Sequence, residues 1–123
     1  MKVEVKITKN FKKQAKRLLK KYASLHDELQ ELQAKLSNEP RHGTEILENV
    51  FKIRIAVKSK GKGKSGGLRA ITFIETELIF EAINQSEGLI VVNLLTIYDK
   101  SDTDNISDNE IKELIQRIEN SND

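Results

Sequence analysis

Cysteine and tryptophan are absent from the 123 residues of this sequence, and proline occurs once. The lack of cysteine excludes disulfides and thiolate-bound metals, and nothing indicates an oxidising compartment. The two histidines, His26 and His42, are too few and too isolated to indicate a metal site. No run of about 18 apolar residues occurs, so we expect no membrane span, and the N-terminus lacks the continuous apolar core of a secretion signal. The sequence therefore predicts a cytoplasmic protein that holds no metal.

Aromatic residues are also scarce, at 5%, while hydrophobic residues make up 37%, so leucine, isoleucine and valine must form most of the core. The length corresponds to a single domain, residues 1–123. The net charge is only +2, but the charges are segregated. Residues 1–21 carry nine basic side chains and one acidic side chain. Residues 52–69 carry seven basic and no acidic side chains, whereas residues 99–123 carry three basic and eight acidic side chains. Two basic segments of this kind indicate a polyanionic partner.

The first third of the sequence predicts a strand followed by two helices. Residues 3–7 alternate apolar and charged side chains, which is typical of a strand with one solvated face. Residues 11–22 have apolar side chains at helical spacing with basic ones between them, which predicts an amphipathic helix. A second helix should follow Ser24, with Asp27 completing a capping box, and should end near Ser37. The short link between them predicts an antiparallel helical hairpin.

The rest of the sequence predicts a sheet and one more helix. Three segments have the pattern of strands, namely residues 51–57, 68–74 and 89–98. The last is apolar enough for a central strand covered on both faces, whereas residues 76–88 fit either a strand or a loop. Ser107 and Glu110 form a capping box for the final helix. We expect an α+β fold with a mainly antiparallel twisted sheet, an N-terminal helical hairpin and a C-terminal helix, with the helices on one side of the sheet.

The most distinctive feature is a basic strand-loop-strand unit, residues 52–69. Lys52, Arg54 and Lys58 share one face, because side chains two residues apart on a strand point to the same side. Arg69 begins the next strand and can approach Arg54 if the two strands pair. Cations gathered in this way favour a bound anion, and phosphate is the natural candidate. The loop adds three more lysines with glycines between them, Lys60, Lys62 and Lys64.

Glycines in this loop let the backbone approach a ligand and present its N–H groups. The loop is not a P-loop, because the G-x-x-x-x-G-K-[ST] spacing is absent and a strand follows it instead of a helix. A solvated hairpin tip without a ligand is the alternative interpretation. We favour polyanion binding because the adjoining strand face is basic as well.

A second feature ends the apolar strand, where Tyr98, Asp99 and Lys100 bring a phenol, a carboxylate and an ammonium together. Tyr98 could stack on a base or share a proton. Its ordinary pKa near 10 makes it a poor base at neutral pH without cationic help, which the nearby cations should supply. The alternative is a tyrosine at the edge of the core beside a surface salt pair.

Several motifs occur together: Lys-Ile-Arg at 52–54, Lys-Gly-Lys-Gly-Lys-Ser-Gly-Gly at 60–67, Arg69, Leu-Leu-Thr-Ile-Tyr-Asp-Lys at 94–100 and Ser-Asp-Asn-Glu at 107–110. Together they resemble the RelE/ParE toxin superfamily, most closely its HigB-type, RelE-like branch. The resemblance covers nearly the whole chain in the order of its elements. It departs at residues 101–105, which lack the arginine and tyrosine that many RelE toxins place after the last strand.

The resemblance implies the toxin of a type II toxin–antitoxin pair, an endoribonuclease that cleaves messenger RNA on the ribosome and so inhibits translation. It implies no metal or other cofactor, because the 2′-hydroxyl of the RNA is the attacking group and the protein stabilises charge on the phosphate. The residues that match by position as catalytic are Lys52, Arg54, Arg69, Tyr98 and Lys100. The residues interpreted as RNA- or ribosome-binding are Lys58, Lys60, Lys62 and Lys64.

The implied partners are the ribosome with its messenger RNA and a cognate antitoxin, expected to be a helix-turn-helix, HigA-like protein. Operator DNA would be contacted only through the antitoxin complex. Two alternative functions stay open at this point. One is a ParE-like poison of DNA gyrase, and the other is a non-enzymatic RNA- or ribosome-binding module.

Overall fold

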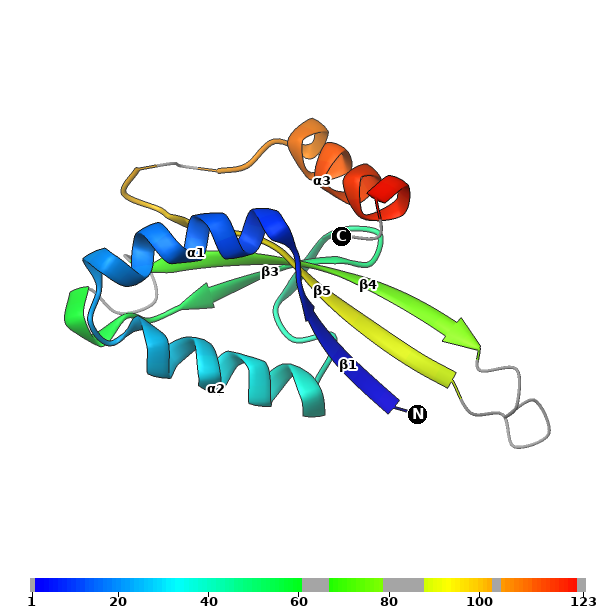
Figure 1. The fold of residues 1–123 in the computed structure, drawn as a ribbon, viewed down its shortest axis with the longest axis horizontal. Coiled ribbons are helices and arrows are strands. Elements are labelled where there is room, and N and C mark those ends of the chain that lie inside the picture. Colours follow the sequence, from blue (N-terminus) through cyan, green and yellow to red (C-terminus); the bar gives the residue numbers. More distant parts are fainter. Residues whose placement is uncertain (1, 61–66, 79–87, 103–104, 122–123) are drawn as a thin grey trace.

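The computed structural model describes residues 2–60, 67–78, 88–102 and 105–121 (Figure 1). The strands are β1 (Lys2–Ile7), β2 (Thr44–Leu47), β3 (Val50–Ile55), β4 (Leu68–Leu78) and β5 (Gly88–Asp99). The helices are α1 (Lys9–Lys21), α2 (Leu25–Asn38) and α3 (Asp108–Ser121), and a short 3₁₀ turn, η1, covers Lys58–Lys60. In the described ranges the chain is therefore α+β, with three α-helices and a five-stranded sheet.

The sheet is mixed and has the strand order β1-β5-β4-β3-β2. The pairs β2–β3, β3–β4 and β4–β5 are antiparallel, but β1 lies parallel to β5. The prediction of a mainly antiparallel sheet therefore holds only in part, because the strand that begins the chain adds a parallel pair. The apolar segment 89–98 forms most of β5, which has a neighbour on each side and is buried over most of its length. The edge strand β2 is not predicted by the sequence pattern.

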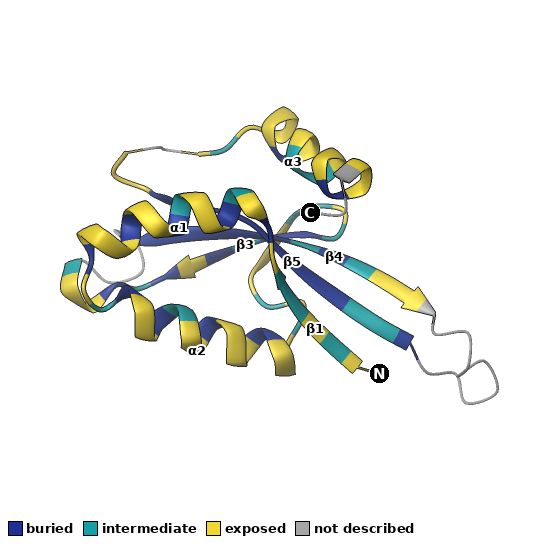
Figure 2. Cartoon of the chain, viewed as in Figure 1, coloured by how far each residue is buried: buried dark blue, intermediate teal, exposed yellow. Residues whose placement is uncertain are grey.

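The helices cover both faces of the sheet (Figures 1 and 2). Leu18 of α1 and Leu32 of α2 belong to one buried cluster with Ile53 of β3. Ile111 of α3 belongs to a second buried cluster with Ile71 of β4, on the opposite face. The prediction that the helices gather on one side is therefore wrong. Both faces of the inner strands carry apolar side chains, so each face needs its own cover.

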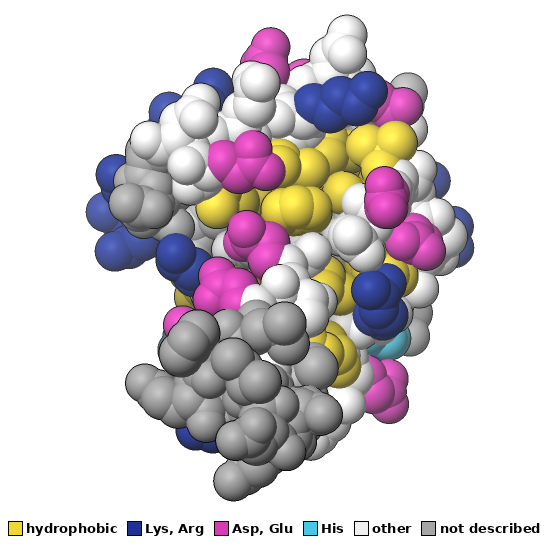
Figure 3. All heavy atoms as spheres, turned by 90° about the vertical axis from the view of Figure 1, so that its right-hand side faces the viewer, with side chains coloured by type: hydrophobic (Ala, Val, Ile, Leu, Met, Phe, Trp, Pro, Cys, Tyr) yellow, Lys and Arg dark blue, Asp and Glu magenta, His cyan; other side chains and the backbone are white. Residues whose placement is uncertain are grey.

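Helix α3 covers its face of the sheet incompletely. Several hydrophobic residues pack against the second cluster while staying partly exposed: Ile46, Leu47, Phe73, Ile106, Leu114 and Ile115. Figure 3, which views the molecule from the right-hand side of Figure 1, shows hydrophobic side chains at the surface with acidic side chains around them. Within the described residues, no helix combines the length and the apolar character needed to cross a membrane.

A β-bulge distorts the pairing of β4 with β5. Ile71 pairs with Thr96, but its neighbour Thr72 pairs with Leu94, so Leu95 is an extra residue on β5. Leu95 packs in the cluster under α3, and Thr96 lines a pocket beside the same helix. The bulge therefore turns two consecutive side chains toward α3.

The same bulge fixes the start of α1 on the sheet. Thr8 Oγ1 donates to the carbonyl oxygens of Leu94 and Leu95, at 2.8 and 3.2 Å, and Asn10 Nδ2 donates to the Leu95 oxygen at 3.0 Å. Thr8 Oγ1 also accepts from the Phe11 N–H at 3.2 Å, as the N-cap of α1. These bonds hold the first turn of α1 against β5.

The turn that joins β2 to β3 contains the one described non-glycine residue with positive φ, Asn49 at 62°. Its N–H donates to Glu45 Oε2 at 2.9 Å, and Arg41 donates to its side-chain oxygen at 3.2 Å. Before β2, Gly43 has φ 105°, and a Cβ there would lie 2.6 Å from the Lys52 oxygen. Both positions use the left-handed region that glycine and asparagine tolerate best.

The predicted start of the final helix is confirmed. Ser107 Oγ accepts from the Glu110 N–H at 3.2 Å and donates to Glu110 Oε1 at 3.1 Å. The first bond is that of a capping box, in which the N-cap hydroxyl accepts from the N–H three residues later. The Glu110 carboxylate closes back onto the Ser107 hydroxyl and not onto its backbone N–H. Ile106 and Ile111, on either side of Ser107, pack in the cluster between α3 and the sheet.

Candidate functional site

Arg54, Arg69 and Tyr98 form a row across three neighbouring strands, which we call the Arg–Tyr row. Arg54 of β3 pairs directly with Arg69 of β4, and Arg69 pairs directly with Tyr98 of β5. Directly paired residues project to the same face of a sheet. That face is the one covered by α3, because Tyr98 belongs to the cluster beneath this helix. The prediction that Arg54 and Arg69 approach each other is confirmed by this register.

Lys52 lies on the same face, in the next row of the sheet, where it pairs with Ile71. Its Nζ donates to Asn105 Oδ1 at 3.5 Å, and the Tyr98 hydroxyl donates to the same oxygen at 3.5 Å. Both bonds are long and therefore weak. Asn105 nevertheless joins Lys52 to the Arg–Tyr row. The sequence carries no signal for this role, since Asn105 lies in the segment between β5 and α3 where the family resemblance fails.

Burial divides these residues into two groups. Arg54 is exposed and Lys52 is half-buried, so both can meet a ligand from solution. Arg69 is only 3% exposed and Tyr98 only 9%. Among its interactions, the Arg69 guanidinium donates to the Leu68 oxygen at 3.1 Å. Arg69 therefore contacts its neighbours inside the fold, and its positive charge acts on the adjacent Tyr98.

The Tyr98 phenol is kept neutral. Burial raises its pKa, and the positive charge of Arg69 lowers it, but the effect of burial is larger and the pKa lies above the ordinary value. The expectation that cations make Tyr98 a base at neutral pH therefore does not fit its environment. A neutral phenol beside a guanidinium is suited to donate a hydrogen bond or a proton.

The other predicted site residues are not members of the Arg–Tyr row. Lys100 is exposed in the turn after β5, where its N–H donates to the Gly67 oxygen at 3.4 Å. Lys58 is exposed in η1, and its N–H donates to Glu28 Oε2 at 2.7 Å. Lys62 and Lys64 lie outside the described residues. The expected catalytic role of Lys100 and the expected RNA-binding roles of Lys58, Lys62 and Lys64 stay predictions.

Lys60 differs most from its expected role, because its side chain is buried. Its ammonium forms an ion pair with Asp99, with 8% of the Lys60 side chain and 0% of the Asp99 side chain exposed. The Tyr22 hydroxyl also donates to Asp99, and Lys60 Nζ donates to Ser101 Oγ at 2.8 Å. Lys60 further lies 5.6 Å from the centroid of the Tyr22 ring. A flexible contact with RNA does not fit this geometry.

The network of Lys60, Asp99 and Tyr22 keeps both charges ionised. Burial alone would raise the pKa of Asp99, but hydrogen bonds from Lys60, Tyr22 and Ser101 outweigh it and hold that pKa well below its usual range. Burial would likewise lower the pKa of Lys60, but its hydrogen bond and attraction to Asp99 raise it. Since neighbouring strand residues face opposite ways, Asp99 points away from Tyr98 and pairs with Lys60, not Lys100.

Hydrogen bonds also tie η1 to the start of α2. Ser24 stands at the N-cap of α2 but makes no side-chain cap bond, so the predicted capping box with Asp27 is wrong. Its hydroxyl instead accepts from the Ser59 N–H at 3.0 Å and lies 3.0 Å from Glu28 Oε1. With the Lys58–Glu28 bond, these contacts hold the beginning of the basic loop in place.

No protein-family model matches this chain, and no curated protein matches it. In the described part of the chain, no group of three His, Asp or Glu side chains is placed to hold a metal ion. The functional interpretation rests on the Arg–Tyr row, on Lys52 and Asn105 beside it, and on the motifs of the sequence.

Proposed function

We propose that this chain is a HigB-type, RelE-like toxin that cleaves messenger RNA on the ribosome and thereby inhibits translation. The observation that supports this best is the Arg–Tyr row, with Lys52 beside it on the same face. Two paired arginines repel each other, so an anion bound at their edge is favoured. A phosphate in an RNA chain satisfies this requirement.

In the proposed reaction, Arg54 and Lys52 bind the scissile phosphate because they are the cations of the site that reach solvent. The 2′-oxygen attacks phosphorus, the bond to the 5′-oxygen breaks, and a 2′,3′-cyclic phosphate forms. The two cations stabilise the negative charge that builds up on the phosphate oxygens. The proton of the 2′-hydroxyl passes to water.

Tyr98 donates a proton to the leaving 5′-oxygen, which is consistent with a phenol that is neutral at physiological pH. Arg69, paired directly with Tyr98, stabilises the phenolate that this transfer creates. Asn105 orients the Tyr98 hydroxyl through their 3.5 Å contact. Arg69 and Asn105 are thus positioning residues in this scheme, while Arg54, Lys52 and Tyr98 meet the substrate.

The proposal extends to the partners. Lys58 and the loop lysines 62 and 64 contact RNA or the ribosome, and this contribution weakens with added salt. A helix-turn-helix, HigA-like antitoxin neutralises the toxin, and operator DNA is contacted through that complex. The site of action is the cytoplasm, where ribosomes translate.

The test is to map cleavage of a translated message by the purified chain and its variants. Arg54→Ala and Lys52→Ala should each lower cleavage, whereas Lys35→Ala, an exposed lysine on α2, should not. Removing a preorganised donor to the transition state costs about 10²–10³ in rate. Because both site residues reach the surface, their variants should unfold at the same denaturant concentration as the parent. Full cleavage by a folded Arg54→Ala variant would show that the assigned site is wrong.

A second candidate is a non-enzymatic RNA- or ribosome-binding module. The burial of Arg69 and Tyr98 favours it, because Lys52 and Arg54 alone suffice to position a phosphate backbone. The two candidates differ in the fate of the message. Arrest of translation with intact message, and no effect of Tyr98→Phe on the arrest, would support the binding module.

A further inference from the structure

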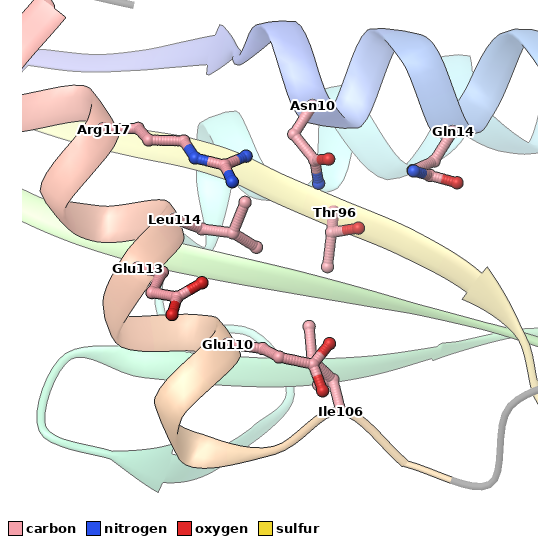
Figure 4. A pocket seen from close by; sticks show the side chains of 8 residues that line it. All are labelled: Asn10, Gln14, Thr96, Ile106, Glu110, Glu113, Leu114 and Arg117. Carbon is pink, nitrogen blue, oxygen red and sulfur yellow. The ribbon is translucent and has the colours of Figure 1, made fainter.

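A pocket of about 220 Å³ lies between α1 and α3, over β5 (Figure 4). Helix α1 contributes Asn10 and Gln14, and α3 contributes Glu113, Leu114 and Arg117. In Figure 4 the side chains of both helices extend into the space above the strand. The bulge in β5 helps to shape this pocket, because the bulged residue Leu95 accepts from Asn10 and so holds the α1 wall in place beside Thr96.

The pocket adjoins the Arg–Tyr row. Its floor contains Thr96, which lies two residues before Tyr98 and on the same face of β5, about 7 Å away along the strand. Ile106 also lines the pocket, and it follows Asn105, which contacts the Tyr98 hydroxyl. A nucleotide that meets Tyr98, at the β5 end of the row, can thus place its base in this pocket.

The lining suits a base and not a phosphate. Its apolar residues are Ile106 and Leu114, and the amides of Asn10 and Gln14 lie at the edge. Asn10 Nδ2 is bound to the Leu95 oxygen and Gln14 Oε1 accepts from Arg17, which leaves the Asn10 oxygen and the Gln14 amino group for other partners. Glu110, Glu113 and Arg117 also line the pocket, so carboxylates outnumber guanidinium groups there. Phosphate is repelled by this negative charge and attracted to the neighbouring row, where the two charged side chains are both arginines. The positive charge of the Arg–Tyr row therefore favours the RNA phosphate, and the more acidic pocket beside it favours an uncharged base.

We propose that this pocket binds one base next to the scissile phosphate and prefers bases that carry an exocyclic amino group. This inference rests on the proposed function, because it assigns a base position within that site. Glu113 is the selecting residue, since Glu110 Oε1 already accepts from Ser107. A carboxylate accepts hydrogen bonds and cannot donate them, so it recognises the amino group of cytosine and finds only a carbonyl oxygen at that position of uracil.

The first experiment measures nucleoside binding to the whole chain by NMR titration, with cytidine and uridine compared. Cytidine should shift the amide signals of the pocket residues and bind roughly tenfold more tightly than uridine. Glu113→Gln should reduce that difference, because an amide can donate to the uracil oxygen. Glu119→Gln, the same change on an exposed residue of α3 that does not line the pocket, should keep it. Equal binding of the two nucleosides to the parent chain, or no binding of either, would overturn the proposal.

The second experiment maps cleavage sites on a translated message and separates this inference from the proposed function. Glu113→Gln should raise the frequency of uracil at one position beside the cut. Cleavage whose base pattern is the same in the parent and in Glu113→Gln would refute the base pocket and leave the nuclease function standing. Tighter binding of cytidine than of uridine, without any cleavage of the message, would support the base pocket and refute the nuclease function.

Discussion

Replacing Lys60 with methionine tests the strongest structural departure from the sequence-based expectation. The lysine is expected to be one of several flexible cations in a Gly/Lys/Ser loop, but its ammonium is paired with the buried Asp99 carboxylate. Lys60→Met removes the charge and keeps much of the aliphatic stem. The carboxylate then retains the hydrogen bonds from the Tyr22 hydroxyl and the Ser101 N–H.

Breaking a buried ion pair by removing one partner costs about 3–5 kcal/mol, because the other charge stays buried without compensation. Because two hydrogen-bond donors to Asp99 remain, we expect the free energy of unfolding to fall by about 3 kcal/mol, the lower end of this range. This is a large fraction of the total stability of a small domain, which is about 5–15 kcal/mol. Changing Asp99 to asparagine in the same chain should recover part of the loss, since no unpaired charge is then left.

Urea-induced unfolding at neutral pH measures the effect. With a slope of about 1–3 kcal/mol per M, a loss of this size lowers the unfolding midpoint by about 1–3 M without changing the slope. Lys58→Met is the matched control, because Lys58 is exposed two residues earlier and contacts Glu28 only through its backbone. Lys58→Met should change the free energy of unfolding by no more than about 0.5 kcal/mol. Equal midpoints for the two variants would refute the assignment of Lys60 to a buried pair.

The pH dependence provides an independent check. The pKa of Asp99 is lowered on folding, so its contribution to stability is present above its unfolded pKa of about 3.9 and is lost as the pH falls below that value. The pKa of Lys60 is raised, so its contribution is present below about 10.4 and is lost as the pH rises further. The stability difference between the parent and Lys60→Met should therefore be flat around neutral pH and shrink in acid. A difference that persists unchanged in strong acid would contradict this account.

Two further predictions concern the site and the fold. Tyr98→Phe should slow cleavage by about 10²–10⁴-fold through loss of the proton donor, measured in a single turnover on programmed ribosomes; an unchanged rate would remove Tyr98 from the mechanism. Asn49→Val should lose about 1–2 kcal/mol more stability in urea than Asn49→Gly, because φ is 62° at this position and a β-branched residue is strained there. Since both variants lose the same hydrogen bond from Arg41, equal midpoints would show that the turn relaxes.

Much of the fold follows from local periodicity. The alternation in residues 3–7 and the helical spacing in residues 11–22 correspond to β1 and α1, because periods of 2 and 3.6 report which side of an element is buried. The edge strand β2 has no such signal, since it is four residues long and no more than half-buried. The sequence pattern also does not predict that α3 covers the opposite face of the sheet. An apolar stripe shows that one side of a helix is buried, but it does not show against which surface.

Local sequence patterns identify the basic strand-loop-strand unit and bring Arg54 near Arg69 on condition that its two strands pair, because a hairpin joins residues that are close along the chain. The register of β3 and β4 adds that the two arginines are direct partners. Tertiary packing makes Lys60 a buried partner of Asp99, in contrast to the exposed Lys58 two residues earlier. That choice depends on where the end of β5 meets η1 and Tyr22, three segments distant in sequence. The same holds for Asn105 at Tyr98 and for the pocket between α1 and α3. Spacing along a chain encodes the faces of local elements, whereas the partner of a buried charge is set by how those elements pack.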